Sequence, residues 1–347
     1  MSAGARTPYA EEPSQREALG QLGHAGRVAG PPPVGGTGAG RRRGSGGAVA
    51  GRARPGPYAG RVVLLRWHLD AVVVAGLGAL AVVYVGAVRV VRSRGGTVAP
   101  ARLRWFWWAL AVLVVALVSP LATVSEERFS AHMVQHLLLT YGAAPLLAFA
   151  APVTLWLQAL PPGSRGRRRL LAVLHSRVVW VLSFPVVTWV AFAAVMYATH
   201  FSPLYDASLS SPVLHGFEHL LYLGVAALFW WPVVRRDPVP GAFPWPARLL
   251  YLFLAMPLQS FLGLAIYSAD RVLYDHYAAF GGALADQQLA GAIMWAGGDA
   301  FMVVALGAAI AGWMRWDARE AVRVDAALDA ARAARAARAS GGARPEL

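Results

Sequence analysis

Seven long runs of uncharged, mostly apolar residues dominate the chain from residue 71 onward. The runs cover residues 71–88, 105–125, 129–164, 178–205, 207–234, 249–269 and 287–314. Only Glu218 in the fifth run and Asp299 in the seventh carry a charge. A helix needs about 20 apolar residues to cross the hydrocarbon core of a bilayer, and each run reaches or approaches that length. The pattern predicts an all-α, polytopic membrane protein with seven transmembrane helices.

Composition excludes several classes of protein. Charged residues make up only 14% of the chain, against about 25% in average usage, which argues against a simple water-soluble enzyme. The chain has no Cys, so disulfides, thiolate metal sites and iron–sulfur clusters are excluded. All 32 basic residues are Arg, and they lie in the tails and in short segments between the apolar runs. That placement fits a membrane topology signal, and no nucleic-acid partner is expected.

The chain divides into three parts. Residues 1–66 are rich in Gly, Pro and Arg and are expected to be disordered. Residues 67–316 form the seven-helix membrane domain, and residues 317–347 form an Ala/Arg-rich tail. Arg is concentrated in the first, third and fifth loops and at the start of the C-terminal tail. By the positive-inside rule these segments and the C-terminus are cytoplasmic, and the N-terminus is outside.

Polar side chains gather at the ends of the predicted helices that share one membrane face. His132 and His136 open the third helix, and His200 ends the fourth. Three polar residues open the fifth helix, and three open the seventh: His215, Glu218, His219, Asp286, Gln287 and Gln288. By alternation all of these ends are extracytoplasmic. Of nine His, seven fall on this face, among them His68 and His276; for His276 and for the cytoplasmic His175 a structural role is expected.

The spacing of four histidines indicates a metal site. His132 and His136, and likewise His215 and His219, are four residues apart, which places each pair on one face of its helix. Imidazole suits Cu, Zn, Fe and Ni. The predicted ligand set is His132, His136, His200, His215, Glu218, His219 and Asp286. Supporting residues are Met133, Gln287 and Asp299, although Met133 lies about 100° around its helix from His132 and Asp299 could simply form a helix–helix hydrogen bond.

At these residues the sequence resembles the CtaG-like family of assembly factors for caa3-type cytochrome c oxidase, seven-span membrane proteins of bacteria. The most specific matches are HMVQHLLL at 132–139 and DQQLAGAIMW at 286–295. Further matches lie at residues 119–121, 129–131, 145–147, 151–152, 200–206, 215–219 and 229–232. The resemblance implies a non-enzymatic, metallochaperone-like factor in the plasma membrane. Its partners would be oxidase subunits, and its cargo would be copper for the CuA or CuB centre.

Two other functions remain open from the residues alone. A seven-span membrane zinc hydrolase would use three protein ligands and a water, with Glu218 or Asp286 as general base. The chain has neither an HExxH motif nor a nucleophile motif. A haem-b electron-transfer protein would use histidines from two helices as axial ligands. The sequence leaves the identity of the metal and the oligomeric state undecided.

Overall fold

The computed structural model describes residues 66–341, with side chains through residue 338. All of them belong to one unit, Pro55–Leu347, and every regular element within the described range is a helix. The expectation of disorder for residues 1–66 falls, apart from residue 66, outside the described residues. The all-α class predicted from the sequence is confirmed.

Six helical segments are long and apolar enough to cross a membrane. They are α2 (Ala71–Ser93), α3 (Pro100–Leu117), the composite helix Phe129–Ala159, α12 (Pro212–Val234), α13 (Trp245–Tyr267) and the composite helix Ala283–Arg338. The predicted fourth span is different. There, α10 (Pro185–His200) has only 16 residues and meets α11 (Leu204–Ser210) at a bend of 69°. The pair passes as a span only when both helices are taken together.

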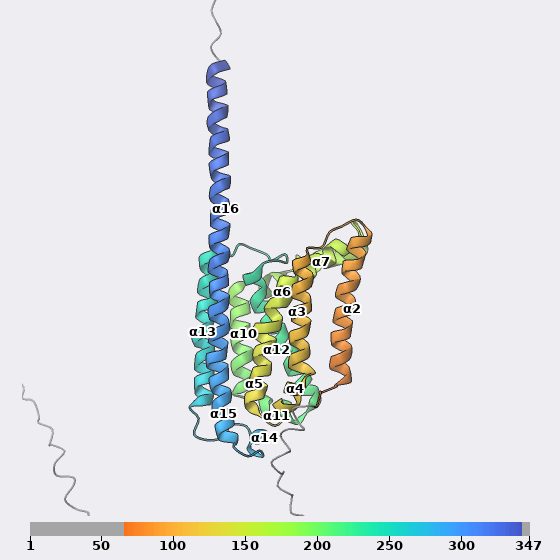
Figure 1. Ribbon diagram of the computed structural model, residues 1–347, viewed down its shortest axis with the longest axis vertical. Coiled ribbons are helices and arrows are strands. Elements are labelled where there is room, and N and C mark those ends of the chain that lie inside the picture. The colour runs from red at the N-terminus through yellow and green to blue at the C-terminus, as the bar shows by residue number, and fades with distance from the viewer. Residues whose placement is uncertain (1–65, 342–347) are drawn as a thin grey trace, which may run out of the picture. The chain divides into compact units, whose positions relative to one another are not determined.

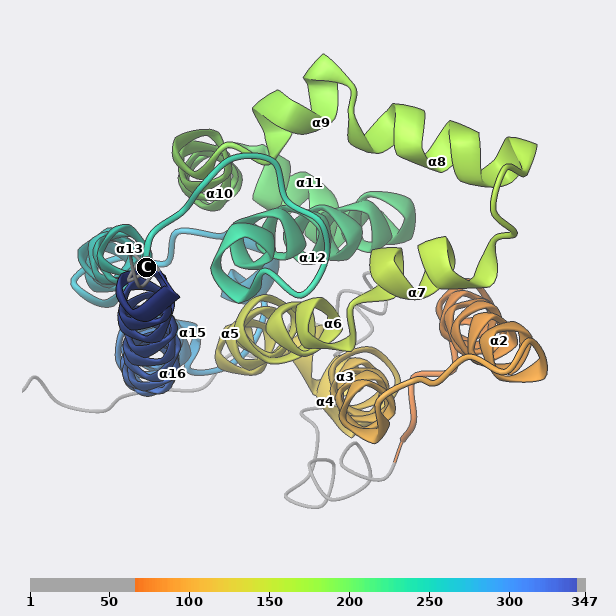
Figure 2. The same ribbon diagram turned by 90° about the horizontal axis from the view of Figure 1, so that it is seen from above.

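The third span is broken near its middle and turns at its end. It consists of α5 (Phe129–Leu137), the π-helical segment η1 (Leu138–Ala143), α6 (Ala144–Ala150) and α7 (Pro152–Ala159). Proline lacks an N–H and clashes with the carbonyl four residues before it, and the widened turn of η1 precedes Pro145. Ala151 has a φ of 51°, and α7 starts after it in a new direction (Figure 2).

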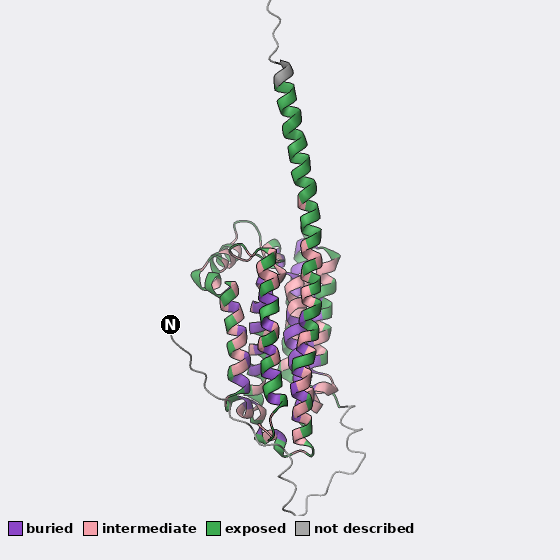
Figure 3. Ribbon diagram, turned by 90° about the vertical axis from the view of Figure 1, so that its left-hand side faces the viewer, coloured by how far each residue is buried: buried purple, intermediate pink, exposed green. Residues whose placement is uncertain are grey.

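The helix of the predicted seventh span continues far beyond its apolar run. It comprises α15 (Ala283–Ala292), the π-helical η2 (Ile293–Gly297) and α16 (Gly298–Gly341). The predicted boundary at residues 316 and 317 is therefore not a break in the structure. Almost every described residue of α16 beyond it is exposed (Figure 3), which agrees with a solvated helix.

Short helices cover the two ends of the bundle. At the end that is lower in Figure 1 lie α4 (Pro120–Ser125), α11 and α14 (Asp275–Ala278). We call this the lower end. At the opposite end, α7, α8 (Arg165–Leu174) and α9 (Arg177–Leu182) run transversely to the long helices, with α8 and α9 along one outer edge when the bundle is viewed from above (Figure 2). The third and fifth spans both begin at the lower end, so their first turns are neighbours.

The main core lies between α10, α12, α13 and the two composite helices, Phe129–Ala159 and Ala283–Arg338. It is built from fully buried aromatic and aliphatic side chains, including Phe129, Met133, Tyr222, Phe229 and Leu262. In contrast, α2 packs mainly along α3 and α7. At the start of α12, the side chain of Ser211 accepts a hydrogen bond from the Leu214 N–H and Pro212 occupies the first turn, a favourable helix start.

Candidate metal centre

Three histidines from two helices converge at the lower end of the bundle. His132 and His136 on α5 and His219 on α12 each offer a ring nitrogen, and these nitrogens lie within 4.8 Å of one another. The Nε2 atoms of His132 and His136 are 2.8 Å apart. The side chains are shielded from solvent, with exposures of 0% for His132, 4% for His136 and 9% for His219. The structure thus brings together residues of both predicted pairs.

The spacing of these nitrogens is close to that of metal ligands. Two nitrogens bound about 2.0–2.1 Å from one metal are about 2.9 Å apart at a right angle and about 4.1 Å apart in a line. The His132–His136 separation of 2.8 Å already suits adjacent ligands. The 4.8 Å span of the group exceeds the linear limit by about 0.7 Å. A small inward movement of His219 toward α5 would therefore complete a three-nitrogen site.

A hydrogen bond fixes the tautomer of His132. The Tyr277 hydroxyl donates to the Ser125 carbonyl oxygen at 3.0 Å and lies 3.2 Å from Nδ1 of His132. Burial raises the pKa of Tyr277, so the phenol keeps the proton that it donates. Because that hydroxyl has a single hydrogen, Nδ1 of His132 must be the donor in the second contact. Nε2 of His132 is then unprotonated, and it accepts the hydrogen bond from Nε2 of His136 at 2.8 Å.

Several buried polar atoms around the three imidazoles have no hydrogen-bond partner. They are Nδ1 of His136, Nε2 of His200, Nε2 of His219 and Oε1 of Glu218. A buried polar atom without a partner costs about 1–3 kcal/mol, so four in one place are a substantial defect for a purely structural cluster. All four atoms are electron-pair donors in their unprotonated forms. A single ion can be bound by only one ring nitrogen of His136, so coordination would satisfy the atoms of His200, His219 and Glu218.

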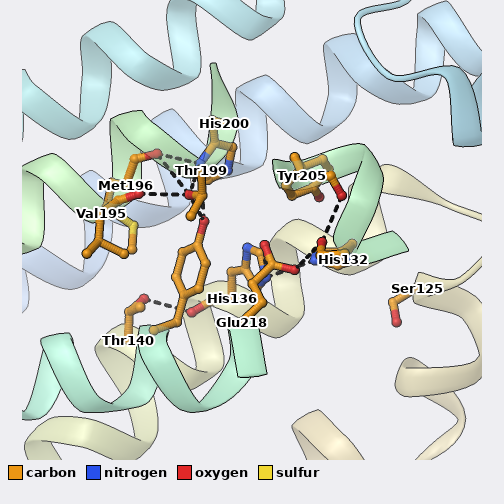
Figure 4. A network of polar contacts seen from close by, with 12 residues as sticks. Ser125, His132, His136, Thr140, Val195, Met196, Thr199, His200, Tyr205 and Glu218 are labelled. Atoms are coloured by element: carbon orange, nitrogen blue, oxygen red, sulfur yellow. Dashed lines mark hydrogen bonds and ion pairs between the residues drawn. The ribbon is translucent and has the colours of Figure 1, made fainter. Parts of the chain in front are cut away.

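His200 and Glu218 stand beside the three-nitrogen group (Figure 4). Nδ1 of His200 lies 2.7 Å from the Met196 carbonyl oxygen and donates to it, which leaves Nε2 unprotonated. Glu218 places Oε1 3.9 Å from Nε2 of His136 and accepts a hydrogen bond from the Ser208 hydroxyl through Oε2 at 2.7 Å. Both residues could join a metal at the group after a modest rearrangement.

His215 occupies the outer side of the cluster. Its ring centroid is 4.3 Å from that of His219 and 5.2 Å from that of His132. It is only partly buried and is not one of the three histidines whose nitrogens converge. Of the four histidines in the two predicted pairs, three therefore converge, and the fourth, His215, lies next to them and nearer the surface.

The remaining predicted residues lie outside this group. Asp286 accepts hydrogen bonds from the Ser130 hydroxyl at 2.6 Å and the Ser130 N–H at 3.3 Å, at the start of α5. Gln287 bonds the backbone of residues 271 and 273. Met133 is buried in the main core. Asp299 accepts a hydrogen bond from Ser260 at 2.7 Å, between α16 and α13, which is the helix–helix bond given above as its structural alternative.

Four tyrosines that the sequence analysis did not single out enclose the histidines. Tyr222 stacks on His136, with ring centroids 4.2 Å apart, and its hydroxyl is 2.6 Å from the Thr199 hydroxyl. Tyr205 stacks on His200 at 5.5 Å, and the Tyr274 hydroxyl donates to the His200 carbonyl oxygen at 3.1 Å. Tyr277 is the fourth. Tyr222 follows His219 by three residues on the same helical face, so helical spacing could have revealed it; the other three come from connecting segments.

The donor set fits a borderline metal ion. Imidazoles with one carboxylate and without thiolate suit Cu and Zn, and three protein ligands leave a position open for exchange. Nitrogen spacing, the unpaired buried atoms and the fixed tautomers of His132 and His200 all agree with such an ion.

Comparison with known proteins assigns the chain to a family. Residues 82–316 match the family of the cytochrome c oxidase caa3 assembly factor. The chain is 32% identical over 278 residues to uncharacterized proteins of Mycobacterium bovis and Mycobacterium tuberculosis, covering 77% of this chain and 42% of each relative. A Mycobacterium leprae protein is 31% identical over 274 residues, 76% of this chain and 42% of that protein.

The chain thus spans less than half the length of these relatives. No solved structure matches it. The family match begins within α2 and ends in α16, so it includes every histidine of the cluster. The resemblance seen in the sequence is confirmed: the chain belongs to the caa3-type cytochrome c oxidase assembly factor family.

Proposed function

We propose that this assembly factor carries copper at His132, His136 and His219 and passes it to a cytochrome c oxidase subunit. The observation that carries the proposal is the convergence of three histidine nitrogens within 4.8 Å, next to buried donor atoms that lack partners. Copper is the cargo here and no reaction on it is required, so the role is non-enzymatic. His200 and Glu218 are the adjoining ligands that a transferred ion could exchange onto.

Copper is favoured over zinc by the function of the family and by the character of the site. Cytochrome c oxidase needs copper for its CuA and CuB centres, so an assembly factor for it has copper as a natural cargo. Three imidazoles without a thiolate form an open set whose ligands can be replaced. Asp286 supports this set by holding the first turn of α5, where Ser130 binds it, rather than by binding the ion.

We also infer that the chain has seven spans, with the histidine cluster on the extracytoplasmic face of a bacterial plasma membrane. In support, α10 lies alongside α12 in the bundle (Figure 1), and together with α11 it would form the fourth span. The upper end carries the arginines of α8 and of the loops that follow α2 and α12. The positive-inside rule puts that end, and the part of α16 beyond the apolar run, in the cytoplasm.

Metal analysis of purified protein tests this function. The wild type and a His132→Ala/His136→Ala variant would be loaded with Cu(I) and, separately, with Zn(II), then washed and analysed. We expect near-stoichiometric copper in the wild type and its loss in the variant. A His175→Ala protein serves as the matched control, because His175 lies at the opposite end and bonds only the Leu171 carbonyl among the described residues.

The cellular counterpart measures oxidase maturation. Cells that carry the double variant in place of the wild type should assemble less copper-loaded oxidase, seen as lower oxidase activity at equal membrane levels of the factor. Preferential retention of zinc, or normal oxidase in the double variant, would contradict the copper-carrier function.

A further inference from the structure

The histidines at the lower end are graded in exposure from the surface to the interior. The side chain of His68, just before α2, is 39% exposed. His215 is partly buried, His219 retains 9% exposure, and His132 retains none. The inner rings of this series lie close together: the ring centroid of His215 is 4.3 Å from that of His219 and 5.2 Å from that of His132. His215 is thus the member that touches both the inner site and the outer surface.

The site is closed toward the membrane interior. Above it, along the helices that carry the histidines, lie Met196, Tyr222, Phe192 and Phe229, all at most 4% exposed. Tyr222 covers one face of His136 directly. An uncoordinated metal ion would pay a large desolvation cost among these side chains. The ion therefore has no low-energy route through the core.

The site is also covered on the side of α11 and α14. Phe129, Tyr205, Tyr274 and Tyr277 are at most 4% exposed and form a continuous aromatic layer, with ring centroids 4.5 to 5.7 Å apart. Tyr277 is fixed to Ser125 and to His132. This layer leaves the side of the cluster occupied by His215 as the open one.

At the surface, two further histidines meet the same short segment after α4. Nδ1 of His68 lies 3.4 Å from Oε1 of Glu126, and Nε2 of His276 lies 2.8 Å from the Glu126 carbonyl oxygen. His276 also packs on Tyr277, with ring centroids 5.0 Å apart, and the Tyr277 hydroxyl contacts His132. Glu126 is exposed, so this group offers two imidazoles and a carboxylate to an ion arriving from solution. We call His68, Glu126 and His276 the mouth.

We propose that the mouth and His215 form the access path by which Cu(I) reaches and leaves the buried site. This inference rests on the proposed function. An ion that moves by ligand exchange keeps some of its ligands while it replaces others, so each donor must lie within a few ångströms of the next. His215 is the partly buried donor beside His219 and His132, and in this path it takes the ion over from the mouth. In this path His276 has a functional role, whereas the sequence alone indicated a structural one.

The rate of copper exchange tests this path separately from the capacity of the site. Purified full-length protein in nanodiscs would be mixed anaerobically with the acetonitrile complex of Cu(I), and loading would be followed in time. Removal would be followed with bathocuproine disulfonate, a strong Cu(I) chelator. The variants are His215→Ala and His68→Ala/His276→Ala, with His175→Ala as the control at the opposite end.

We expect His215→Ala to slow both loading and removal by about tenfold or more, within the range seen when supporting groups of metal sites are removed. The amount bound at equilibrium should stay that of the wild type. A His215→Met variant should recover most of the rate with Cu(I), because a thioether is also a copper ligand, and should not recover it with Zn(II).

Unchanged or faster exchange in His215→Ala would overturn the path, since His215 would then be a plug or a bystander. Equal rates in the mouth variant and the wild type would remove His68 and His276 from it. Absence of bound copper in the wild type at equilibrium would refute the proposed function itself, and the path with it.

Discussion

Replacement of Gly291 by alanine is expected to destabilise the protein, although alanine is the better helix former. Gly291 lies on α15, where the helix crosses α13 at very short range. A Cβ added there would lie 2.5 Å from the backbone nitrogen of Tyr267 and 2.7 Å from the carbonyl oxygen of Gly263. Small residues at such crossings allow close backbone approach in membrane proteins.

The size of the effect follows from this geometry. Ordinary van der Waals contact begins at 3.4 Å, so the two backbones must separate by about 0.9 Å. Overpacking of this kind costs about 1–3 kcal/mol, whereas the gain in helix propensity from Gly to Ala is at most about 1 kcal/mol. The net result is a loss of stability of up to about 2 kcal/mol. Since α15 also carries Asp286, the start of α5 should shift and copper affinity should fall.

The assay is thermal unfolding in detergent, together with copper titration. Gly307→Ala on α16 is the matched control, because a Cβ there meets nothing within 4 Å; it should unfold at or above the wild-type temperature. Gly291→Ala should unfold below it. If the two variants had the same midpoint, the close crossing of α13 and α15 would be refuted.

Three further changes probe hydrogen bonds, two of them beside the histidines and one at the start of α2. Asp286→Ala removes both bonds to Ser130 and should lower stability by about 1–3 kcal/mol and weaken copper binding; unchanged copper titration would contradict this. Tyr277→Phe removes the acceptor for Nδ1 of His132 and should lower copper affinity about 10- to 100-fold, with no change in the far-UV circular dichroism spectrum. Hydrogen bonds from the backbone N–H groups of residues 73 and 72 hold the pKa of Asp70 below its usual value of 3.8. This cap contributes above pH 3.8 and is lost as the pH falls below it, so the protection of amides in the first turn of α2 against hydrogen exchange, relative to their intrinsic rate at each pH, should fall there, and should fall less in Asp70→Asn.

Much of the bundle could be predicted because the bilayer restricts what an uncharged run can do. Six runs became helices long enough to span, and the alternation of their ends correctly brought His132 and His219 together. The fourth span was less predictable from hydropathy, since Ser183 and Pro185 lie inside an otherwise uninterrupted apolar run. Pro185 begins a new helix there, as proline commonly does.

The detailed site was only partly readable from local spacing. Four-residue spacing gave the contact between His132 and His136, because both lie on α5. It could not show that Tyr205 and Tyr277 would close over them, since these residues come from separate segments and depend on the packing of α11 and α14. Asp286 is similar: its position at a helix end was correct, but its partner Ser130 is 156 residues away.

The central claim is that His132, His136 and His219 hold copper. The most direct test is the copper content of the purified wild type beside that of His132→Ala/His136→Ala, each loaded with Cu(I) and washed at equal protein concentration. We predict near-stoichiometric copper in the wild type and its loss in the variant, with His175→Ala unchanged. Equal copper in the wild type and the double variant would contradict the claim.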